Sequence, residues 1–123
     1  MGSRLNTPQL TVERSEQDGV HLVTLSGELD LYGVPELETT LAQPGPEARI
    51  CLDLTALEFI DSTGLATVIR AHQTLAAGDG AIAVVAAATG SVRRTLEMTG
   101  LTTLLNISAD RATAVQSLGP TPR

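Results

Sequence analysis

The spacing of apolar residues changes from a period of two to helical spacing after the N-terminal part of the chain. Segments 9–14 and 20–27 alternate apolar and polar residues, which predicts two β-strands. The turn-forming sequence Gln-Asp-Gly at 17–19 separates them, so we expect a hairpin. Residues 34–42 then place Pro35 in a first turn and apolar residues on one face, which predicts a short helix.

Two uniformly apolar runs in the rest of the chain predict central strands buried on both faces, and they are 49–54 and 81–87. Apolar residues at helical spacing predict three further helices, over 65–78, 91–100 and 109–118. We expect Ser91 and Ser108 to cap the last two helices and Gly78 to end the first. A short strand is expected at 104–107.

The alternation of strands and helices predicts an α/β fold, with a mixed β-sheet of about five strands and about four helices packed on it. A chain of 123 residues fits a single domain, which we place at residues 9–118. Segment 1–8 is expected to be disordered, and 119–123 to form a C-terminal tail. No apolar run is long enough to span a membrane and no export signal is recognisable, so we expect a cytoplasmic protein.

Charge and residue counts exclude several classes of function. The net charge of −6 argues against direct binding of nucleic acid, because that binding depends on clustered positive charge. Cys51 is the single cysteine, and with only two histidines the chain has no metal-ligand spacing. We therefore expect no metal, no cofactor and no intramolecular disulfide. Neither charge nor pattern assigns an oligomeric state.

Residues 57–65, LEFIDSTGL, contain the most informative polar stretch of the chain. Ser62 and Thr63 lie where a central strand leads into the long helix, and ligand sites of open α/β sheets occupy such loops. The same position suits a helix N-cap, so Ser62 is expected to accept a backbone N–H of the first turn, beside Asp61. The two roles are compatible, because a capping serine is also presented at the surface.

Catalytic interpretations of this serine lack the residues they need. A nucleophile elbow requires glycine two residues before the serine, where this chain has Ile60. The candidate base His72 lies ten residues along the same helix, about 15 Å away. The Gly-Asp-Gly at 78–80 lacks the rest of a phosphate-binding loop. The residues around Ser62 therefore disfavour each of these catalytic interpretations.

Three segments in order resemble the STAS domains of bacterial anti-sigma factor antagonists. They are GELD at 27–30, LDLTALEFIDSTGL at 52–65 and TGLTTLLNI at 99–107, and the similarity extends over about residues 9–118. The resemblance implies that Ser62 is a phosphoacceptor and that the protein is a substrate and a switch, not an enzyme. It also implies that the unphosphorylated domain binds an anti-sigma factor with serine kinase activity, releasing the sigma factor, and that a serine phosphatase reverses the modification.

The resemblance also implies a partner-binding surface made of Asp30, Asp61, Ser62, Thr63 and Gly64. Thr63 replaces a second serine found in many members, and residues 31–33 depart from the family pattern. Asp30 has an alternative role as an Asx-type cap before the first helix. Two other functions stay open: a STAS subunit of a lipid-transport or signalling complex that is never phosphorylated, and a small serine hydrolase or nucleotide-binding enzyme.

Overall fold

The computed structural model describes residues 9–119, and these contain one five-stranded β-sheet. The sheet order, β1-β2-β3-β4-β5, is also the order along the chain. β1 pairs antiparallel with β2, and all later neighbours are parallel, which confirms the predicted hairpin and the mixed sheet. The strands are β1 Leu10–Gln17, β2 Val20–Leu29, β3 Arg49–Ile60, β4 Ala81–Val85 and β5 Asn106–Ser108.

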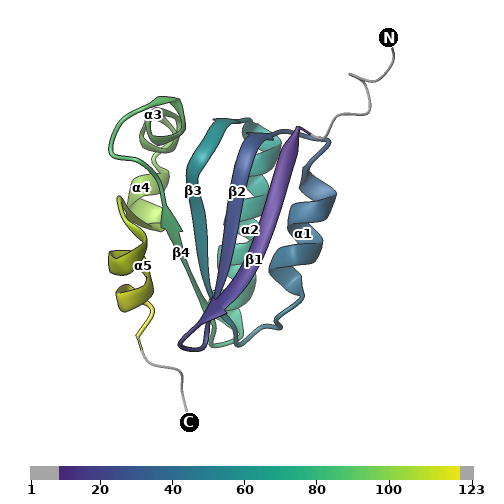
Figure 1. Ribbon diagram of the computed structural model, residues 1–123, viewed down its shortest axis with the longest axis vertical. Coiled ribbons are helices and arrows are strands. Elements are labelled where there is room, and N and C mark those ends of the chain that lie inside the picture. The colour runs from purple at the N-terminus through teal and green to yellow at the C-terminus, as the bar shows by residue number, and fades with distance from the viewer. Residues whose placement is uncertain (1–8, 120–123) are drawn as a thin grey trace.

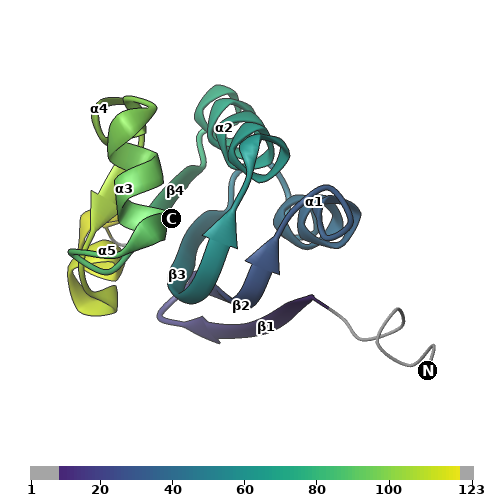
Figure 2. The ribbon, with the colours of Figure 1, turned by 90° about the horizontal axis from the view of Figure 1, so that it is seen from above.

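Helices cover both faces of this sheet. Within residues 9–119 they are α1 Val34–Ala42, α2 Ser62–Ala77, α3 Ser91–Met98, α4 Leu101–Leu104 and α5 Arg111–Ser117. α1 and α2 lie side by side on one face, and β4 lies between α2 and α5 when the molecule is seen from above (Figure 2). The carboxyl ends of β2 and β3 and the first turns of α1 and α2 meet at one end of the molecule (Figure 1).

Two groups of buried side chains hold these layers together. The larger group lies between the sheet and helices α1 to α4, and its fully buried members include Leu25, Leu37, Ile50, Leu52 and Leu96. The smaller group attaches α5 to the other face through Leu22, Cys51, Ala83, Val85 and Ala114. Burying each large apolar side chain contributes roughly 1.5–3 kcal/mol, so the larger group dominates the stability of the fold.

The structure extends the third strand and adds a helix that the pattern did not predict. β3 continues to Ile60, six residues beyond the predicted 49–54. The added part contains exposed residues, so it does not continue the uniformly apolar run that predicted the strand. The β2–β3 pairing has register shifts along this extension. α4 forms a single turn where a strand was expected to begin, so β5 is limited to three residues.

The expected caps Ser91 and Ser108 are wrong. Ser91 is the first residue of α3, and its hydroxyl donates to the Glu58 carbonyl at 3.0 Å. Ser108 ends β5, and Asp110 caps α5 by accepting the backbone N–H of Thr113 at 2.8 Å. The predictions for Pro35 and Gly78 are confirmed. Several cap-forming residues stand close together in the sequence, and the tertiary path of the chain selects among them.

Two predicted segments fall on residues that the structure does not describe, namely segment 1–8 and residues 120–123 of the tail. The domain boundaries at 9 and 118 therefore stay a prediction. Among residues 9–119, no helix combines the length and the apolar character needed to cross a membrane.

Candidate functional site

The parallel pairing of β2 with β3 brings Asp30 and Asp61 to the same edge of the sheet. Leu29 and Ile60 are partners in the register, and the backbone N–H of Asp61 donates to the Leu29 carbonyl at 3.1 Å. Each aspartate directly follows one of these paired residues. Two acids that are distant in the sequence are thus placed beside each other next to Ser62.

Asp61, not Ser62, caps α2, so the expectation that Ser62 is the capping residue is wrong. Asp61 has extended backbone, and its Oδ1 accepts the backbone N–H of Gly64 at 3.0 Å. Ser62 is already the first residue of the helix. The Ser62 hydroxyl therefore takes no part in the cap.

The two neighbouring hydroxyls at this helix start differ in their environment. The Thr63 hydroxyl donates to Asp61 Oδ1 at 2.6 Å, and its side chain is half-buried. Ser62 is exposed, and no side-chain hydrogen bond holds its hydroxyl within residues 9–119. Ser62 therefore presents the more accessible hydroxyl of the pair, whereas the Thr63 hydroxyl is bonded to the capping carboxylate.

Asp61 carries a negative charge next to Ser62 at neutral pH. The hydrogen bond from the Thr63 hydroxyl lowers the pKa of the Asp61 carboxyl from its ordinary value of 3.8. Backbone N–H groups of Gly64, Thr63 and Leu31 lower this pKa further and outweigh the effect of partial burial. These donors favour the ionised carboxylate, which is the form that caps the helix.

Asp30 organises the loop between β2 and α1. Its Oδ1 accepts the backbone N–H of Tyr32 at 3.0 Å, and its carbonyl accepts the N–H of Gly33 at 3.0 Å. This is an Asx turn, but the expected capping role of Asp30 is wrong, because Gly33 occupies the cap position of α1 and no side chain caps that helix. The carboxylate remains half-buried at the edge.

Gly64 fulfils a packing requirement at the same helix start. It is buried, and a Cβ at this position would lie 2.7 Å from Leu29 Cγ and 3.0 Å from Ile60 Cγ1. Only glycine lets the first turn of α2 approach β2 and β3 so closely. Gly64 therefore sets the position of Ser62 without offering a side chain of its own.

Two residue types that could assist a reactive serine, histidine and cysteine, are represented by His72 and Cys51 at other places in the described part of the chain. His72 is half-buried further along α2, and Cys51 is buried under α5, where desolvation raises the pKa of its thiol. In the part of the chain that the structure describes, no group of three His, Cys, Asp or Glu side chains could hold a metal ion.

The apolar pattern did not predict a polar cluster that lies between α5 and the sheet. Buried Asp53 accepts two bonds from Arg111, the shorter at 2.7 Å, and its other oxygen accepts the N–H and hydroxyl of Thr55. Arg111 also donates to the Thr24 hydroxyl at 3.0 Å. An aspartate inside the apolar run 49–54 was the available signal, because a buried charge requires a partner.

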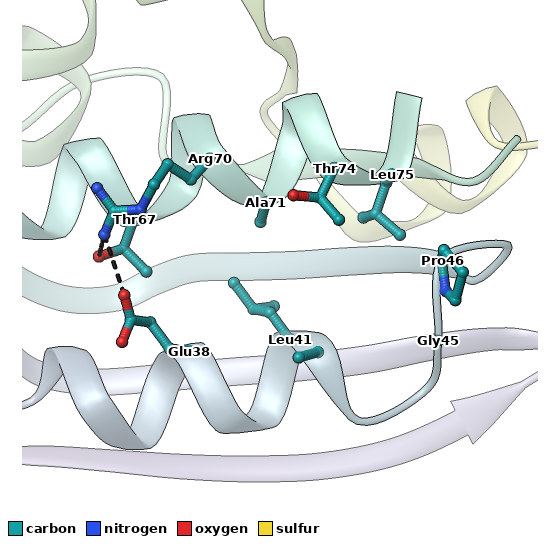
Figure 3. A pocket seen from close by; sticks show the side chains of 10 residues that line it. Glu38, Leu41, Gly45, Pro46, Thr67, Arg70, Ala71, Thr74 and Leu75 are labelled. Atoms are coloured by element: carbon teal, nitrogen blue, oxygen red, sulfur yellow. Dashed lines mark hydrogen bonds and ion pairs between the residues drawn. The ribbon is translucent and has the colours of Figure 1, made fainter. Parts of the chain in front are cut away.

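A groove of about 360 Å³ lies between α1 and α2 and is separate from the residues around Ser62. Figure 3 shows Leu41 and Leu75 from the two helices, with Pro46 at one end. Arg70 and Glu38 meet across the groove at 3.0 Å, and both side chains are about half exposed. An ion pair this exposed contributes little to stability, and it closes one end of the groove.

Comparison with known proteins identifies the family of this chain. A family model described as "Mlab, STAS domain" matches residues 12–106. An anti-sigma-B factor antagonist of Staphylococcus aureus (strain NCTC 8325 / PS 47) is 32% identical over 102 residues, which cover 80% of this chain and 93% of the relative. The chain belongs to the STAS-domain anti-sigma factor antagonist family. The resemblance found in the sequence is thereby confirmed.

Solved structures show the same architecture as this STAS domain. An anti-sigma factor antagonist from Mycobacterium paratuberculosis superposes with a TM-score of 0.77 at 29% identity, covering 89% of this chain and 93% of that one. The antagonist SpoIIAA in its unphosphorylated form gives a TM-score of 0.71 at 20% identity, covering 87% and 95%. The predicted fold class is therefore confirmed along with the family.

Proposed function

We propose that this STAS domain is an anti-sigma factor antagonist controlled by phosphorylation of Ser62. The unphosphorylated domain binds an anti-sigma factor with serine kinase activity, and the sigma factor held by that protein is released. The observation that carries this proposal is the contrast at the start of α2, where Ser62 is exposed and unengaged while Thr63 donates to Asp61. The solved structure of SpoIIAA is described as its unphosphorylated form, which makes phosphorylation the modification to test in this domain.

In this proposal the domain is a substrate and a switch, not an enzyme. The kinase transfers the γ-phosphoryl group of ATP to Ser62 Oγ, so ADP leaves and the hydroxyl proton is released. A serine phosphatase hydrolyses the phosphate ester with water and restores the hydroxyl. The exchange takes place in the cytoplasm, where sigma factors meet RNA polymerase, and the domain itself makes no contact with nucleic acid.

The local charges explain how the phosphate would end binding. A phosphoserine carries about −1.5 to −2 charges at pH 7 and would stand beside the ionised Asp61 and near Asp30. Asp61 already accepts the N–H of Gly64, so the phosphate meets a helix terminus whose cap is occupied. A partner surface fitted to the unmodified edge would lose affinity by repulsion and desolvation.

Intact-mass analysis after incubation with ATP and the serine kinases of the same cell tests the phosphoacceptor. We expect addition of one phosphate, which fragmentation places on Ser62. Ser62→Ala should abolish the modification, and Thr63→Val, which removes the neighbouring hydroxyl, should retain it. Phosphate on Thr63, or undiminished modification of Ser62→Ala, would refute the assignment.

Binding measurements separate the switch from the permanent-subunit alternative. Ser62→Ala should bind the kinase with the affinity of the wild type. Ser62→Asp carries part of the phosphate's charge and should bind at least about tenfold more weakly, which corresponds to about 1.4 kcal/mol. Equal affinities of all three proteins, measured by calorimetry, would favour a STAS subunit of a lipid-transport or signalling complex.

A further inference from the structure

The chain places its few aromatic residues on the surface. The sequence contains one tyrosine, one phenylalanine and no tryptophan. Tyr32 is 87% exposed and Phe59 is 47% exposed, although aromatic side chains ordinarily supply the largest buried areas of a core. The core of this domain is built from leucine, isoleucine, valine and alanine instead. Neither aromatic side chain fills the core, so both are accessible to a binding partner.

Three of the large exposed apolar side chains in the described part of the chain belong to the edge that carries Ser62. Leu31, 60% exposed, and Tyr32 follow Asp30 in the loop after β2. Phe59 lies in β3 three residues before Ser62 and is the register partner of Glu28. The other two, Met98 and Leu104, belong to α3 and α4.

Hydrogen bonds to Asp30 organise the loop that carries Leu31 and Tyr32. Asp30 accepts the backbone N–H groups of Tyr32 and, through its carbonyl, of Gly33. The backbone N–H of Asp61, the residue that caps α2, donates to the Leu29 carbonyl at 3.1 Å, two residues before Leu31. The two side chains therefore project from a turn that is tied to the start of the Ser62 helix, so presenting them to a partner costs little conformational entropy.

Acidic groups accompany these apolar side chains. Asp30 and Asp61 form the base of the loop, and Glu28 stands opposite Phe59 in the neighbouring strand. Glu58 directly precedes Phe59 in β3 and is exposed. A surface that combines an exposed aromatic anchor with carboxylates is complementary to an apolar recess bordered by Arg or Lys side chains.

We propose that Leu31, Tyr32 and Phe59 are the apolar anchor by which the partner protein recognises this domain. The inference rests on the proposed function, because the partner is the anti-sigma factor that the Ser62 switch controls. That protein should present an apolar recess flanked by basic side chains. Aromatic residues at the centre of an interface commonly supply most of its affinity, so Tyr32 determines how tightly the partner binds, and Ser62 determines whether it binds.

Calorimetry with the recombinant serine-kinase anti-sigma factor of the same organism tests the anchor. Tyr32→Ala and Leu31→Ala should each bind at least about tenfold more weakly than wild type, the cost of about 1.4 kcal/mol that defines a substantial interface residue. Met98→Ala is the matched control, since Met98 is 80% exposed but lies at the end of α3. Its affinity should stay within about twofold of wild type.

Thermal melts of the same variants should coincide with wild type, because the altered side chains are exposed. If wild type binds and Tyr32→Ala binds equally well, the anchor is refuted while the proposed function stands. If wild type does not bind the kinase at all, both fail. A change in self-association on Tyr32→Ala, seen by sedimentation with kinase affinity unchanged, would instead assign the surface to a second copy of the chain.

Discussion

The Asp61 carboxylate accepts the backbone N–H of Gly64 at 3.0 Å, and this bond makes Asp61 the cap of the helix on which Ser62 stands. Asp61→Ala should therefore lower the free energy of unfolding by about 0.5–2 kcal/mol. Ser62→Ala removes an exposed hydroxyl and should change the free energy of unfolding by less than about 0.5 kcal/mol. Urea unfolding measures both, and a larger loss in Ser62→Ala would return the capping role to the serine.

Asp30 combines a turn-forming oxygen with a charge, and two substitutions separate them. Asp30→Asn keeps Oδ1 as acceptor for the Tyr32 N–H but removes the charge, so the thermal midpoint should be unchanged and kinase binding weaker. Asp30→Ala also removes the acceptor and should lower the midpoint. If Asp30→Asn binds and is phosphorylated like wild type, the carboxylate is a structural element of the loop alone.

Gly64 offers a test in which the sign of the effect is decisive. At an ordinary helical position Gly→Ala stabilises by about 0.5–1 kcal/mol. Here the new Cβ would lie 2.7 Å from Leu29 Cγ, so Gly64→Ala should destabilise by about 1–3 kcal/mol. It should also slow phosphorylation of Ser62, because the first turn of α2 must move. Stabilisation in urea unfolding would show that the turn adjusts freely.

The ion pair between Arg111 and buried Asp53 should control the acid sensitivity of the fold. Burial alone would raise the pKa of Asp53, but hydrogen bonds from Thr55 and Arg111 lower it from its ordinary value of 3.8. Because the pKa is lower in the folded state, the ionised carboxylate stabilises the fold above the unfolded pKa. That stabilisation is lost as the pH falls through the folded pKa.

Arg111→Ala should therefore cost roughly 1–3 kcal/mol at pH 7, since it leaves a buried carboxylate with fewer donors. It should also move acid unfolding to higher pH, because the pKa of Asp53 rises. Exposed Arg94 on α3 provides the control, and Arg94→Ala should follow the wild-type curve at every pH. Identical pH profiles of wild type and Arg111→Ala would show that the pair does not affect stability.

Local pattern alone predicted most elements of this domain. The period-two segments became the β1–β2 hairpin, and the uniformly apolar runs at 49–54 and 81–87 became central parallel strands. The motif at 52–65 carried the resemblance to the family, and that resemblance, not the periodicity, implied the role of Ser62. The strands and helices are predictable because the period of the apolar residues along each element records which of its faces is buried.

Tertiary structure decided which polar atoms meet. Sequence spacing does not reveal that Asp30 lies beside Asp61, because their proximity depends on the Leu29–Ile60 register between two strands. The choice of Asp61 over Ser62 as cap depends on the backbone angles where β3 ends. The exposure of Tyr32 follows from a turn fixed by Asp30. The first outcome depends on the pairing of strands that lie far apart in the sequence, and the other two depend on local backbone angles, neither of which the pattern of apolar residues records.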